Sequence, residues 1–199
     1  QPDATRRAAT RALAALPLTA VAGRASAQAW PAKPLRLVVG FPAGSTTDIV
    51  ARVMSEQIRI KLGQSAIVEN RAGANGVLGA SEVARSAGDG YTLLFTNSSG
   101  ITVNPQVYKK IPYLPERDFA PVMMVVSAPM LLVINPNKER TARVQSLADL
   151  LALARANPGQ LTYGSGGVGN LAHLGFELVN TKAGIKTAHV PYKGGVAAQ

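Results

Sequence analysis

A short run of β-branched and apolar residues passes directly into a turn and then into a helical pattern, and this order narrows the choice of fold. Leu35–Phe41 is such a run, and it ends in Pro42-Ala43-Gly44, which is typical of a strand entering a tight turn. Residues 45–48 are Ser, Thr, Thr and Asp, side chains that cap helix N-termini. Apolar residues then recur with helical spacing until Gly63, a residue favoured just beyond a helix C-terminus. The pattern predicts a strand, a turn and an amphipathic helix.

The same order continues along the chain. Residues 66–68 form a second apolar run, the glycine-rich stretch 73–79 leads into a helical pattern that reaches about Arg85, and residues 91–96 form a third run. Strands that alternate with helices predict a parallel sheet with right-handed crossovers. Ligands bind to such sheets at the carboxyl ends of the strands. We therefore expect binding residues in the loops that follow the strands.

The most apolar stretch after the N-terminal region is 119–134. Pro121 and Ser127-Ala128-Pro129 interrupt it, so a membrane helix is not expected and two successive strands are predicted. The strand–loop–helix pattern then restarts. Its predicted parts are a helix capped by Ser146 and Asp149 and ending near Ala156, a strand at 161–163, a glycine loop at 164–169, a helix from Leu171 and a strand at 187–190. The prediction is therefore an α/β protein with a first lobe at 28–127 and a second lobe at 128–199.

Residues 1–27 predict a signal peptide. Three arginines within residues 6–11 precede the apolar stretch 12–22, and Ala25-Ser26-Ala27 fits a signal-peptidase site with cleavage before Gln28. The apolar stretch is shorter than the about 20 residues of a membrane-spanning helix. The paired arginines also fit twin-arginine export, but Ala8-Ala9 follows them where larger apolar residues are preferred, so ordinary secretion to the periplasm is favoured. An amphipathic surface helix is the alternative interpretation.

Composition excludes several classes of function. The chain has no cysteine, which excludes disulfides, thiol nucleophiles and cysteine metal sites. The formal charge is +10, and it would be +7 without the first 27 residues, which hold four arginines and one aspartate. Such a surface favours anionic partners. The basic residues are scattered rather than gathered into a stripe with aromatic residues, so nucleic acid is not expected as a partner.

The segment Phe41–Asp48 places hydroxyl groups and unpaired backbone N–H groups at a predicted helix N-terminus. The partial positive charge of such a terminus favours a carboxylate or a phosphate. Plain N-capping needs the same residue types, and the pattern alone does not separate the two interpretations.

Gly164–Gly169 matches the G-x-G-x-x-G spacing between a predicted strand and a predicted helix. A dinucleotide site also needs an acidic residue about 20 positions later, and residues 187–190 contain none. Ser165 does not lie in G-x-S-x-G, so a nucleophile elbow is not supported. We therefore expect no cofactor.

The histidines do not predict a metal or a catalytic site. His173 and Glu177 lie one helical turn apart, a spacing more typical of helix packing than of a metal site. His189 lies in a predicted strand and is interpreted as structural. No paired carboxylates stand in a motif for acid–base chemistry. No catalytic or metal-binding residue is assigned.

Several segments taken together are more specific than any one of them. In chain order they are Leu37–Gly44 with Thr47-Asp48 and Ala51-Arg52, Glu69–Gly76 with Gly79, Asp89–Leu94, Asp118–Val122, Tyr163–Gly166 with Gly169 and His173-Leu174, and His189–Gly194. In this order they resemble the Bug/TctC-type receptors of the tripartite tricarboxylate transporter family. The likeness extends over residues 30–199. Gly88 and Leu114 depart from the family pattern, at positions outside the expected pocket.

The resemblance implies a type II-like periplasmic binding fold, with two α/β lobes that close a cleft on a small organic carboxylate. Family ligands include di- and tricarboxylates, acidic amino acids and aromatic acids, and the receptor delivers them to permease subunits in the membrane. We expect carboxylate oxygens to meet mainly backbone N–H groups and hydroxyls. The predicted ligand-binding residues are Gly44, Ser45, Thr46, Asp48, Thr96, Asn97 and Ser98 in the first lobe and Ser165, Gly166, Gly169, Asn170 and His173 in the second.

Two other classes of function stay open. An exported α/β enzyme of the esterase or reductase type would need a nucleophile–base pair or a cofactor fingerprint. A carboxylate-binding adaptor to a sensor would share every sequence feature of a transport receptor, and neighbouring permease genes would distinguish the two.

The last residues, 194–199, resemble the opening of a further loop–helix unit. We therefore expect the reading frame to continue and the second lobe to be incomplete here. An unfinished sheet exposes apolar strands and edges. Residues 28–199 alone are therefore expected to be poorly soluble or partly molten and to bind carboxylates weakly or not at all.

Overall fold

The computed structural model describes residues 29–198, and the compact unit that begins at Lys33 contains all the elements given below. The predicted signal peptide and its cleavage site lie outside the described residues. No helix in the described part of the chain combines the length and apolar character needed to cross a membrane.

The first part of the unit is a parallel sheet of three strands. β1 (Leu35–Val39) lies in the centre, with β2 (Ala66–Asn70) on one side and β3 (Thr92–Phe95) on the other. In the register, Leu37 stands opposite Val68 of β2 and Leu93 of β3. The parallel sheet and its strands are therefore confirmed, and all three strands end at the same edge.

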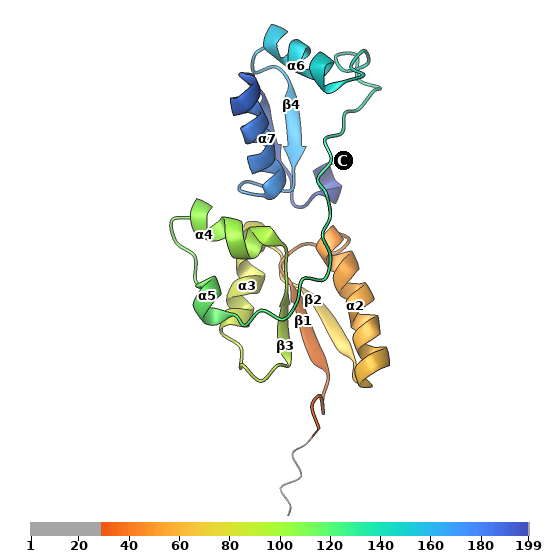
Figure 1. Ribbon diagram of the computed structural model, residues 1–199, viewed down its shortest axis with the longest axis vertical. Coiled ribbons are helices and arrows are strands. Elements are labelled where there is room, and N and C mark those ends of the chain that lie inside the picture. Colours follow the sequence, from red (N-terminus) through yellow and green to blue (C-terminus); the bar gives the residue numbers. More distant parts are fainter. Residues whose placement is uncertain (1–28, 199) are drawn as a thin grey trace, which may run out of the picture. The chain divides into compact units, whose positions relative to one another are not determined.

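Helices α2 (Thr46–Leu62) and α3 (Val77–Ala84) lie on opposite faces of this sheet (Figure 1). Side chains alternate between the faces of a strand. Leu35 and Leu37 accordingly pack with Ile58 of α2, while Arg36 reaches Glu82 of α3. Local chemistry sets the helix ends, since Ser45 caps α2 and Gly63 ends it in the left-handed conformation, with φ of 69°.

Short helices follow the strands of the first sheet. η1 (Ala74–Gly76) opens α3, and η2 (Ser99–Val103) runs into α4 (Asn104–Val107), before α5 (Pro115–Asp118). The side chain of Tyr113 is buried against Val77 and Ala80 of α3. This contact holds the segment after β3 against the α3 face of the sheet.

The later part of the chain builds a second, smaller α/β layer. α6 (Leu147–Ala156) is capped by Ser146, and β4 (Thr162–Ser165) pairs in parallel with β5 (Ala188–Pro191). α7 (Leu171–Ala183) connects the two strands, and η3 (Val196–Ala198) follows β5. The predicted helices and strands are confirmed here. β4 extends two residues further than predicted, because Gly164 and Ser165 pair with Val190 and Pro191.

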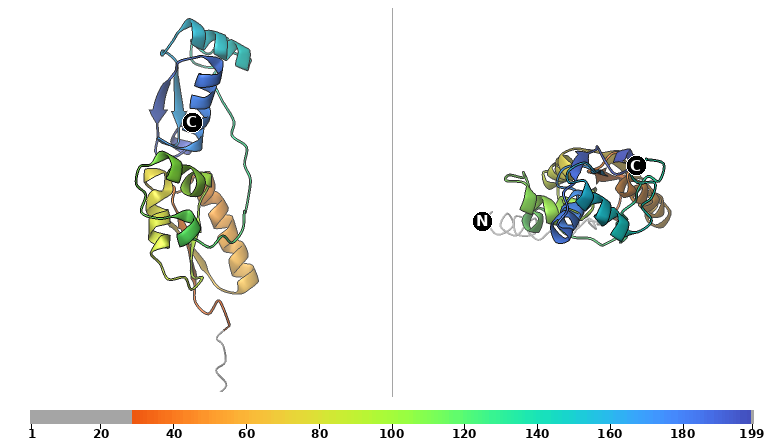
Figure 2. Two further views of the ribbon diagram at one scale, coloured as in Figure 1. Left: turned by 60° about the vertical axis from the view of Figure 1, so that its left-hand side comes forward. Right: turned by 90° about the horizontal axis from the view of Figure 1, so that it is seen from above.

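The prediction of two strands within residues 119–134 is wrong. The segment runs without secondary structure between α5 and α6 (Figures 1 and 2). A strand requires a neighbour for its N–H and C=O groups, and within residues 29–198 no strand pairs with this segment. Phe119 packs against Tyr113, but most of the later side chains are exposed to solvent, with Met124 82% exposed and Leu131 81% exposed. The proposed lobe boundary at residues 127 and 128 falls inside this segment and stays a prediction.

Candidate functional site

The carboxyl edge of the first sheet brings together two groups of predicted ligand-binding residues. One group follows β1 at residues 44–48, and the other follows β3 at residues 96–98. The loop after β2, residues 71–76, emerges at the same edge, because neighbouring parallel strands end side by side. The structure therefore places these loops as the sequence pattern led us to expect, and ligand binding by their residues stays a prediction.

The N-terminus of α2 is organised by Asp48. Its carboxylate accepts hydrogen bonds from Gly44 N at 2.9 Å, from Arg52 Nε at 3.0 Å and from Asn70 Nδ2 at 2.9 Å. The residue is 2% exposed. The hydrogen bonds from Arg52 come first among the causes that lower the pKa of Asp48 to about 2, against the opposing effect of burial. Asp48 is thus an ionised group that shapes the loop from within.

The other predicted residues of this loop stand nearer to solvent. Ser45 Oγ accepts the N–H of Asp48 at 3.3 Å, which is an ordinary N-cap. Gly44 has a φ of 81°, a conformation that favours glycine, and its N–H is directed to Asp48. Thr46 is exposed at the first position of α2. The exposed hydroxyl of Thr46 and the first turn of a 17-residue helix are therefore the groups in this loop that remain suited to an anion.

Asn70 is a residue of this edge that sequence reasoning missed. Besides Asp48, its Nδ2 reaches Phe41 O at 3.0 Å, and its Oδ1 lies 3.3 Å from Arg52 Nη2. Asn70 thereby ties the end of β2 to the loop after β1 and to α2. Its place two residues after the predicted strand at 66–68 was a signal, although nothing in the sequence named its partners.

Asn75 and Asn104 were also missed. Asn75 has a φ of 54°, which asparagine tolerates better than most residues. Its Nδ2 donates to Asn104 Oδ1 at 2.9 Å and to Gly169 O at 3.1 Å, and Asn104 Nδ2 donates back to Asn75 O at 3.0 Å. Asn75 Oδ1 and Ser99 Oγ are buried without a hydrogen-bond partner among the described residues. Two polar atoms near the edge therefore lack a protein partner.

The loop after β3 is partly closed on itself. Asn97 Oδ1 accepts the N–H of Ser99 at 2.9 Å, and Thr96 Oγ1 lies 3.4 Å from Asn97 O. Ser98 is exposed just before η2. Of these three predicted residues, Ser98 presents the most accessible side chain.

The second group of predicted residues surrounds the glycine loop, which we define as residues 165–170. Asn170 Oδ1 caps α7 by accepting the N–H of Ala172 at 2.9 Å, and Gly166 O accepts the N–H of Gly194 at 3.2 Å. His173 Nδ1 accepts the N–H of Gly169 at 3.1 Å. Through the carbonyl of Gly169, the glycine loop is hydrogen-bonded to Asn75 of the first group of loops.

Ser165 and His189 form a pair that sequence reasoning did not find. Ser165 Oγ lies 2.6 Å from His189 Nε2, as in an activated nucleophile. However, Ser165 is 2% exposed, and its oxygen also accepts the N–H of Gly167 at 3.2 Å. A buried hydroxyl held by its own loop is arranged for structure rather than for attack on a substrate.

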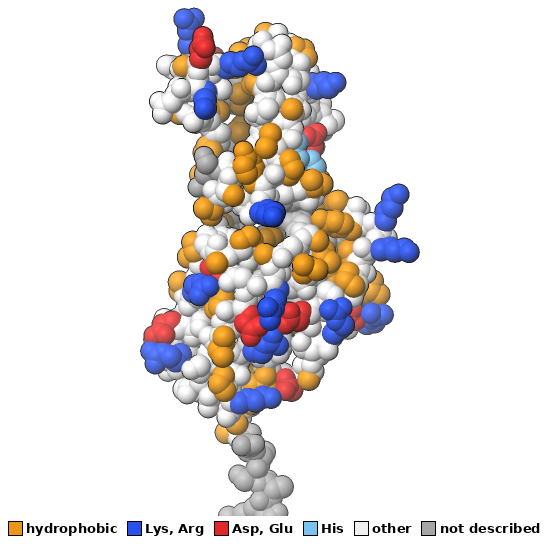
Figure 3. Space-filling model, turned by 180° about the vertical axis from the view of Figure 1, so that it is seen from behind, with side chains coloured by type: hydrophobic (Ala, Val, Ile, Leu, Met, Phe, Trp, Pro, Cys, Tyr) orange, Lys and Arg blue, Asp and Glu red, His pale blue; other side chains and the backbone are white. Residues whose placement is uncertain are grey.

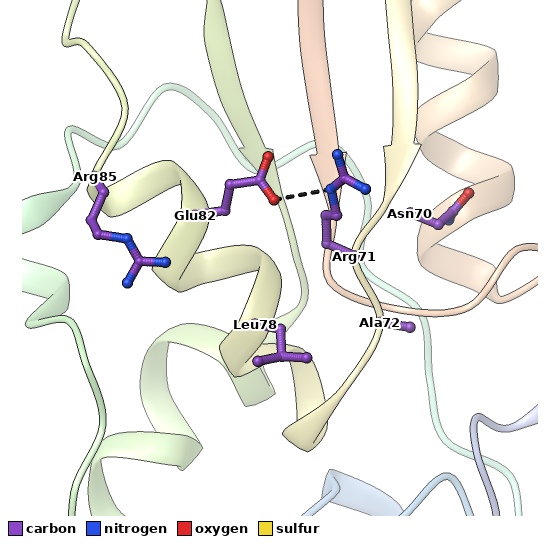
Figure 4. Close-up of a pocket in the computed structure, with 6 residues that line it drawn as sticks. All are labelled: Asn70, Arg71, Ala72, Leu78, Glu82 and Arg85. Atoms are coloured by element: carbon purple, nitrogen blue, oxygen red, sulfur yellow. Dashed lines mark ion pairs between the residues drawn. The ribbon is translucent and has the colours of Figure 1, made fainter.

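An open hollow of about 530 Å³ lies beside α3. It is lined by Asn70, Arg71, Ala72, Leu78, Glu82 and Arg85 (Figure 4). Arg71 Nε points to Glu82 at 2.9 Å, and Arg36 bridges Glu69 and Glu82 at 2.9 and 2.7 Å. Arg85 donates to Ser81 Oγ at 2.7 Å. Arg36 and Arg71 are already paired with carboxylates, so a small anion would have to displace a carboxylate to bind these two arginines. Figure 3 likewise shows acidic side chains set among basic ones on the face that it presents.

The described residues contain no cluster of three or more His, Cys, Asp or Glu side chains that could hold a metal ion. Glu177, one turn from His173, instead accepts a hydrogen bond from Tyr163 at 2.6 Å. The geometry thus offers backbone N–H groups, hydroxyls and amides, which are groups that bind an anion without a full opposite charge.

Relatives of known sequence identify the family. Residues 50–199 match the model of the tripartite tricarboxylate transporter family receptor, TctC. Protein BugT of Bordetella pertussis is 40% identical over 175 residues, which is 87% of this chain and 52% of BugT. A UPF0065 protein of a Pseudomonas species is 36% identical over 196 residues, 97% of this chain and 57% of that protein. The chain spans about half the length of these relatives.

Solved structures agree with the sequence relatives. An R. palustris protein solved with adipate is 38% identical, with a TM-score of 0.78 over 83% of this chain and 54% of its own. Periplasmic binding protein BugD is 31% identical, with a TM-score of 0.74 over 85% of this chain and 55% of its own. MatC from Rhodopseudomonas palustris, with bound malate, is 28% identical, with a TM-score of 0.73 over 83% of this chain and 55% of MatC. The fold is therefore the α/β fold of periplasmic binding proteins, and the chain belongs to the TctC family of tripartite tricarboxylate transporter receptors.

Proposed function

We propose that this chain belongs to an extracytoplasmic receptor that captures a small organic carboxylate for a tripartite tricarboxylate-type transporter. The observation that carries the proposal is the likeness to two R. palustris proteins solved with adipate and with malate. The ligand class expected is a di- or tricarboxylate, an acidic amino acid or an aromatic acid. The membrane permease is the expected partner.

The carboxyl edge of the first sheet supports this ligand class. The first turn of α2 supplies partial positive charge and backbone N–H groups, and Thr46 adds an exposed hydroxyl. The negative charge of Asp48 does not oppose an anion strongly, because Arg52 pairs with it at 3.0 Å. Dipoles and water can hold a carboxylate in such a site without a dedicated cation.

Binding of the ligand without conversion is part of the proposal. Ser165 and His189 form the pair of groups closest to a nucleophile and base, and the serine is buried. A chain acting as a receptor should release its ligand chemically unchanged. Mass spectrometry of adipate or malate recovered after overnight incubation checks this, and any product that depends on Ser165 would favour the enzyme alternative.

A screen of ligands on a full-length version of the protein, extended to the length of its relatives, tests the proposed class. Adipate, malate, citrate, glutamate and benzoate should be compared with glucose and NAD by thermal shift and then by calorimetry. At least one carboxylate should stabilise the protein in a concentration-dependent way, because a ligand that binds the folded state shifts unfolding by mass action. Stabilisation by glucose or NAD alone would contradict the proposal.

A pair of substitutions on α2 tests the place of binding. Thr46→Glu adds a negative charge at the carboxyl edge, where an acid also suits the helix N-terminus, so folding should not suffer. Val53→Glu adds the same charge at an exposed position along the same helix. Thr46→Glu should weaken carboxylate binding by about tenfold or more through repulsion, while Val53→Glu should leave it nearly unchanged. Equal effects would place the ligand elsewhere.

Export to the periplasm is the last element of the proposal. Expressed with an initiating methionine, the protein should be recovered from the periplasm with Gln28 as its new N-terminus. N-terminal sequencing of the periplasmic fraction measures this. Uncleaved protein in the cytoplasm would show that residues 1–27 are not a signal peptide.

A further inference from the structure

Aromatic and imidazole rings form a stack beneath the glycine loop. Tyr163 of β4 and His189 of β5 are register partners, and their ring centroids lie 4.9 Å apart. His173 of α7 stacks on His189 at 4.0 Å, and Phe176 stacks on Tyr163 at 4.2 Å. Two strands and the inner face of α7 thus contribute to one layer of rings, directly below residues 165–170.

Each imidazole in this stack is connected to a different N–H group of the glycine loop. His173 Nδ1 accepts the N–H of Gly169 at 3.1 Å, so this nitrogen carries no proton and the neutral ring holds its proton on Nε2. His189 acts through Ser165. Its Nε2 lies 2.6 Å from Ser165 Oγ, and that oxygen accepts the N–H of Gly167 at 3.2 Å.

The backbone that these contacts hold is unusual. Gly167 has a φ of 132° and Gly169 a φ of 75°, conformations that glycine adopts readily and that add little stability by themselves. A loop of this kind needs contacts from outside to stay in one conformation. The two histidine-linked hydrogen bonds supply such contacts at both of its positive-φ glycines.

The surroundings of His189 favour the neutral form of its ring. Burial is the main cause that lowers the pKa of His189, with a further contribution from His173 and an opposing one from Glu177. Tyr163 directs its hydroxyl to Glu177 and not to either histidine. A neutral His189 can accept the Ser165 proton at Nε2 in place of Gly167 O, which lies 3.1 Å from the same hydroxyl, while a lone pair of Ser165 Oγ accepts the N–H of Gly167.

We propose that His173 and His189 are positioning residues that fix the glycine loop, and that they contribute to carboxylate affinity by holding its backbone in the binding conformation without contacting the ligand. This inference rests on the proposed receptor function. It also changes the role expected for Ser165 and His173, which then act through the loop instead of as direct ligands.

Asparagine and glutamine variants separate hydrogen bonding from ring packing. An asparagine amide oxygen sits near the position of histidine Nδ1, and a glutamine amide sits near that of Nε2. His173→Asn should therefore keep the acceptor for Gly169, and His173→Gln should lose it. At His189 the glutamine variant should keep the acceptor and the asparagine variant should lose it, because His189 makes its contact through Nε2. All four variants remove a ring, so packing alone predicts no such crossed pattern.

Amide hydrogen exchange measured by NMR is the first readout, and it requires no ligand. The Gly169 amide should exchange about tenfold faster in His173→Gln and near the wild-type rate in His173→Asn, as expected for loss of one hydrogen bond of about 1.4 kcal/mol. The Gly167 amide should exchange about tenfold faster in His189→Asn and not in His189→Gln. Equal acceleration by both members of a pair would overturn the proposal.

Two further measurements keep the test decisive if a variant unfolds. Ser165→Ala leaves both rings in place, and it should accelerate exchange at Gly167 while leaving Gly169 unchanged. In the wild-type protein at pH 8, nitrogen NMR of the imidazoles should show the His173 proton on Nε2. A proton on Nδ1 at that pH, or no effect of Ser165→Ala, would overturn the proposal.

Affinity for adipate and malate, measured on the full-length version, is the second readout. His173→Asn and His189→Gln, which keep the hydrogen-bond acceptors, should bind within about twofold of wild type. His173→Gln and His189→Asn, which lose them, should bind about tenfold more weakly. If wild-type protein binds neither acid, the proposed function fails, and the exchange pattern still decides whether the histidines position the loop. If wild type binds and all four variants bind equally, the positioning role in binding is wrong.

Discussion

Replacement of Asp48 with alanine is expected to lower the free energy of unfolding by about 3 kcal/mol at pH 7. The substitution leaves the N–H of Gly44 without its Asp48 acceptor and removes one acceptor of Asn70 Nδ2. Hydrogen bonds to charged groups contribute about 1.5–3 kcal/mol each, and buried donors left unpaired are costly. Urea unfolding of both proteins measures the difference.

Asp149 provides a matched control for this substitution. The N-terminus of α6 repeats the arrangement of α2, since Asp149 N–H donates to the cap Ser146 and Asp149 Oδ2 accepts from Gln145 N at 3.1 Å. Asp149 is exposed, and among residues 29–198 it has no arginine or asparagine partner of the kind that Asp48 has. Asp149→Ala should therefore cost clearly less than Asp48→Ala. Equal losses would mean that capping alone explains the role of Asp48.

The effect of Asp48 should also depend on pH. Its pKa falls from an ordinary value of 3.8 to about 2 in the folded chain, so its carboxylate stabilises the fold fully above pH 4 and loses this contribution as the pH falls toward 2. The corresponding free energy is about 2 kcal/mol. The stability difference between wild type and Asp48→Asn should shrink over that interval. A difference that stays constant from pH 6 to pH 2 would contradict the assigned ionisation.

Alanine substitutions at two helical glycines are expected to have opposite effects. A Cβ at Gly79 of α3 would lie 2.8 Å from Gly40 Cα and 3.2 Å from Gly40 N, which are backbone atoms that cannot rotate away. Gly79→Ala should therefore destabilise the protein by about 2–3 kcal/mol, as overpacking does. This clash outweighs the gain of about 1 kcal/mol that alanine normally gives inside a helix.

Gly175 of α7 is the counterpart. Nothing lies within 4 Å of a Cβ built there, and the residue is exposed. Gly175→Ala should therefore stabilise the protein by about 0.5–1 kcal/mol through helix propensity alone. Thermal and urea unfolding of the two variants measure both changes. Destabilisation by Gly175→Ala, or a neutral Gly79→Ala, would show that backbone proximity does not decide the role of these glycines.

The contact at Gly79 also bears on the candidate site. Gly40 follows β1 at the carboxyl edge, and its own Cβ position lies 2.9 Å from Gly76 Cα. Three glycines thus let the loop after β1, the loop after β2 and the start of α3 approach each other at the backbone. An alanine at Gly79 would push α3 away from this edge, so carboxylate binding should weaken together with stability.

Local chemistry allowed most elements to be predicted from the sequence. Ser45, Ser146 and Gly63 act on backbone groups within a few residues of themselves, so their effects can be derived without knowing the rest of the chain. Alternating apolar runs and helical patterns predicted the order of strands and helices, and with it the edge at which the loops after β1 and β3 meet. The segments that resemble the TctC family added the expected ligand class.

Long-range pairing decided the rest. Residues 119–134 have the composition of strands, yet a strand exists only where a second segment supplies hydrogen bonds, and none among residues 29–198 does so here. Asp48 and Asn70 are 22 residues apart, and Ser165 and His189 are 24 apart. Sequence by itself determined the elements, because caps and periodicity are local. Only the tertiary structure decided which polar groups meet, because those contacts depend on how distant strands and helices pack.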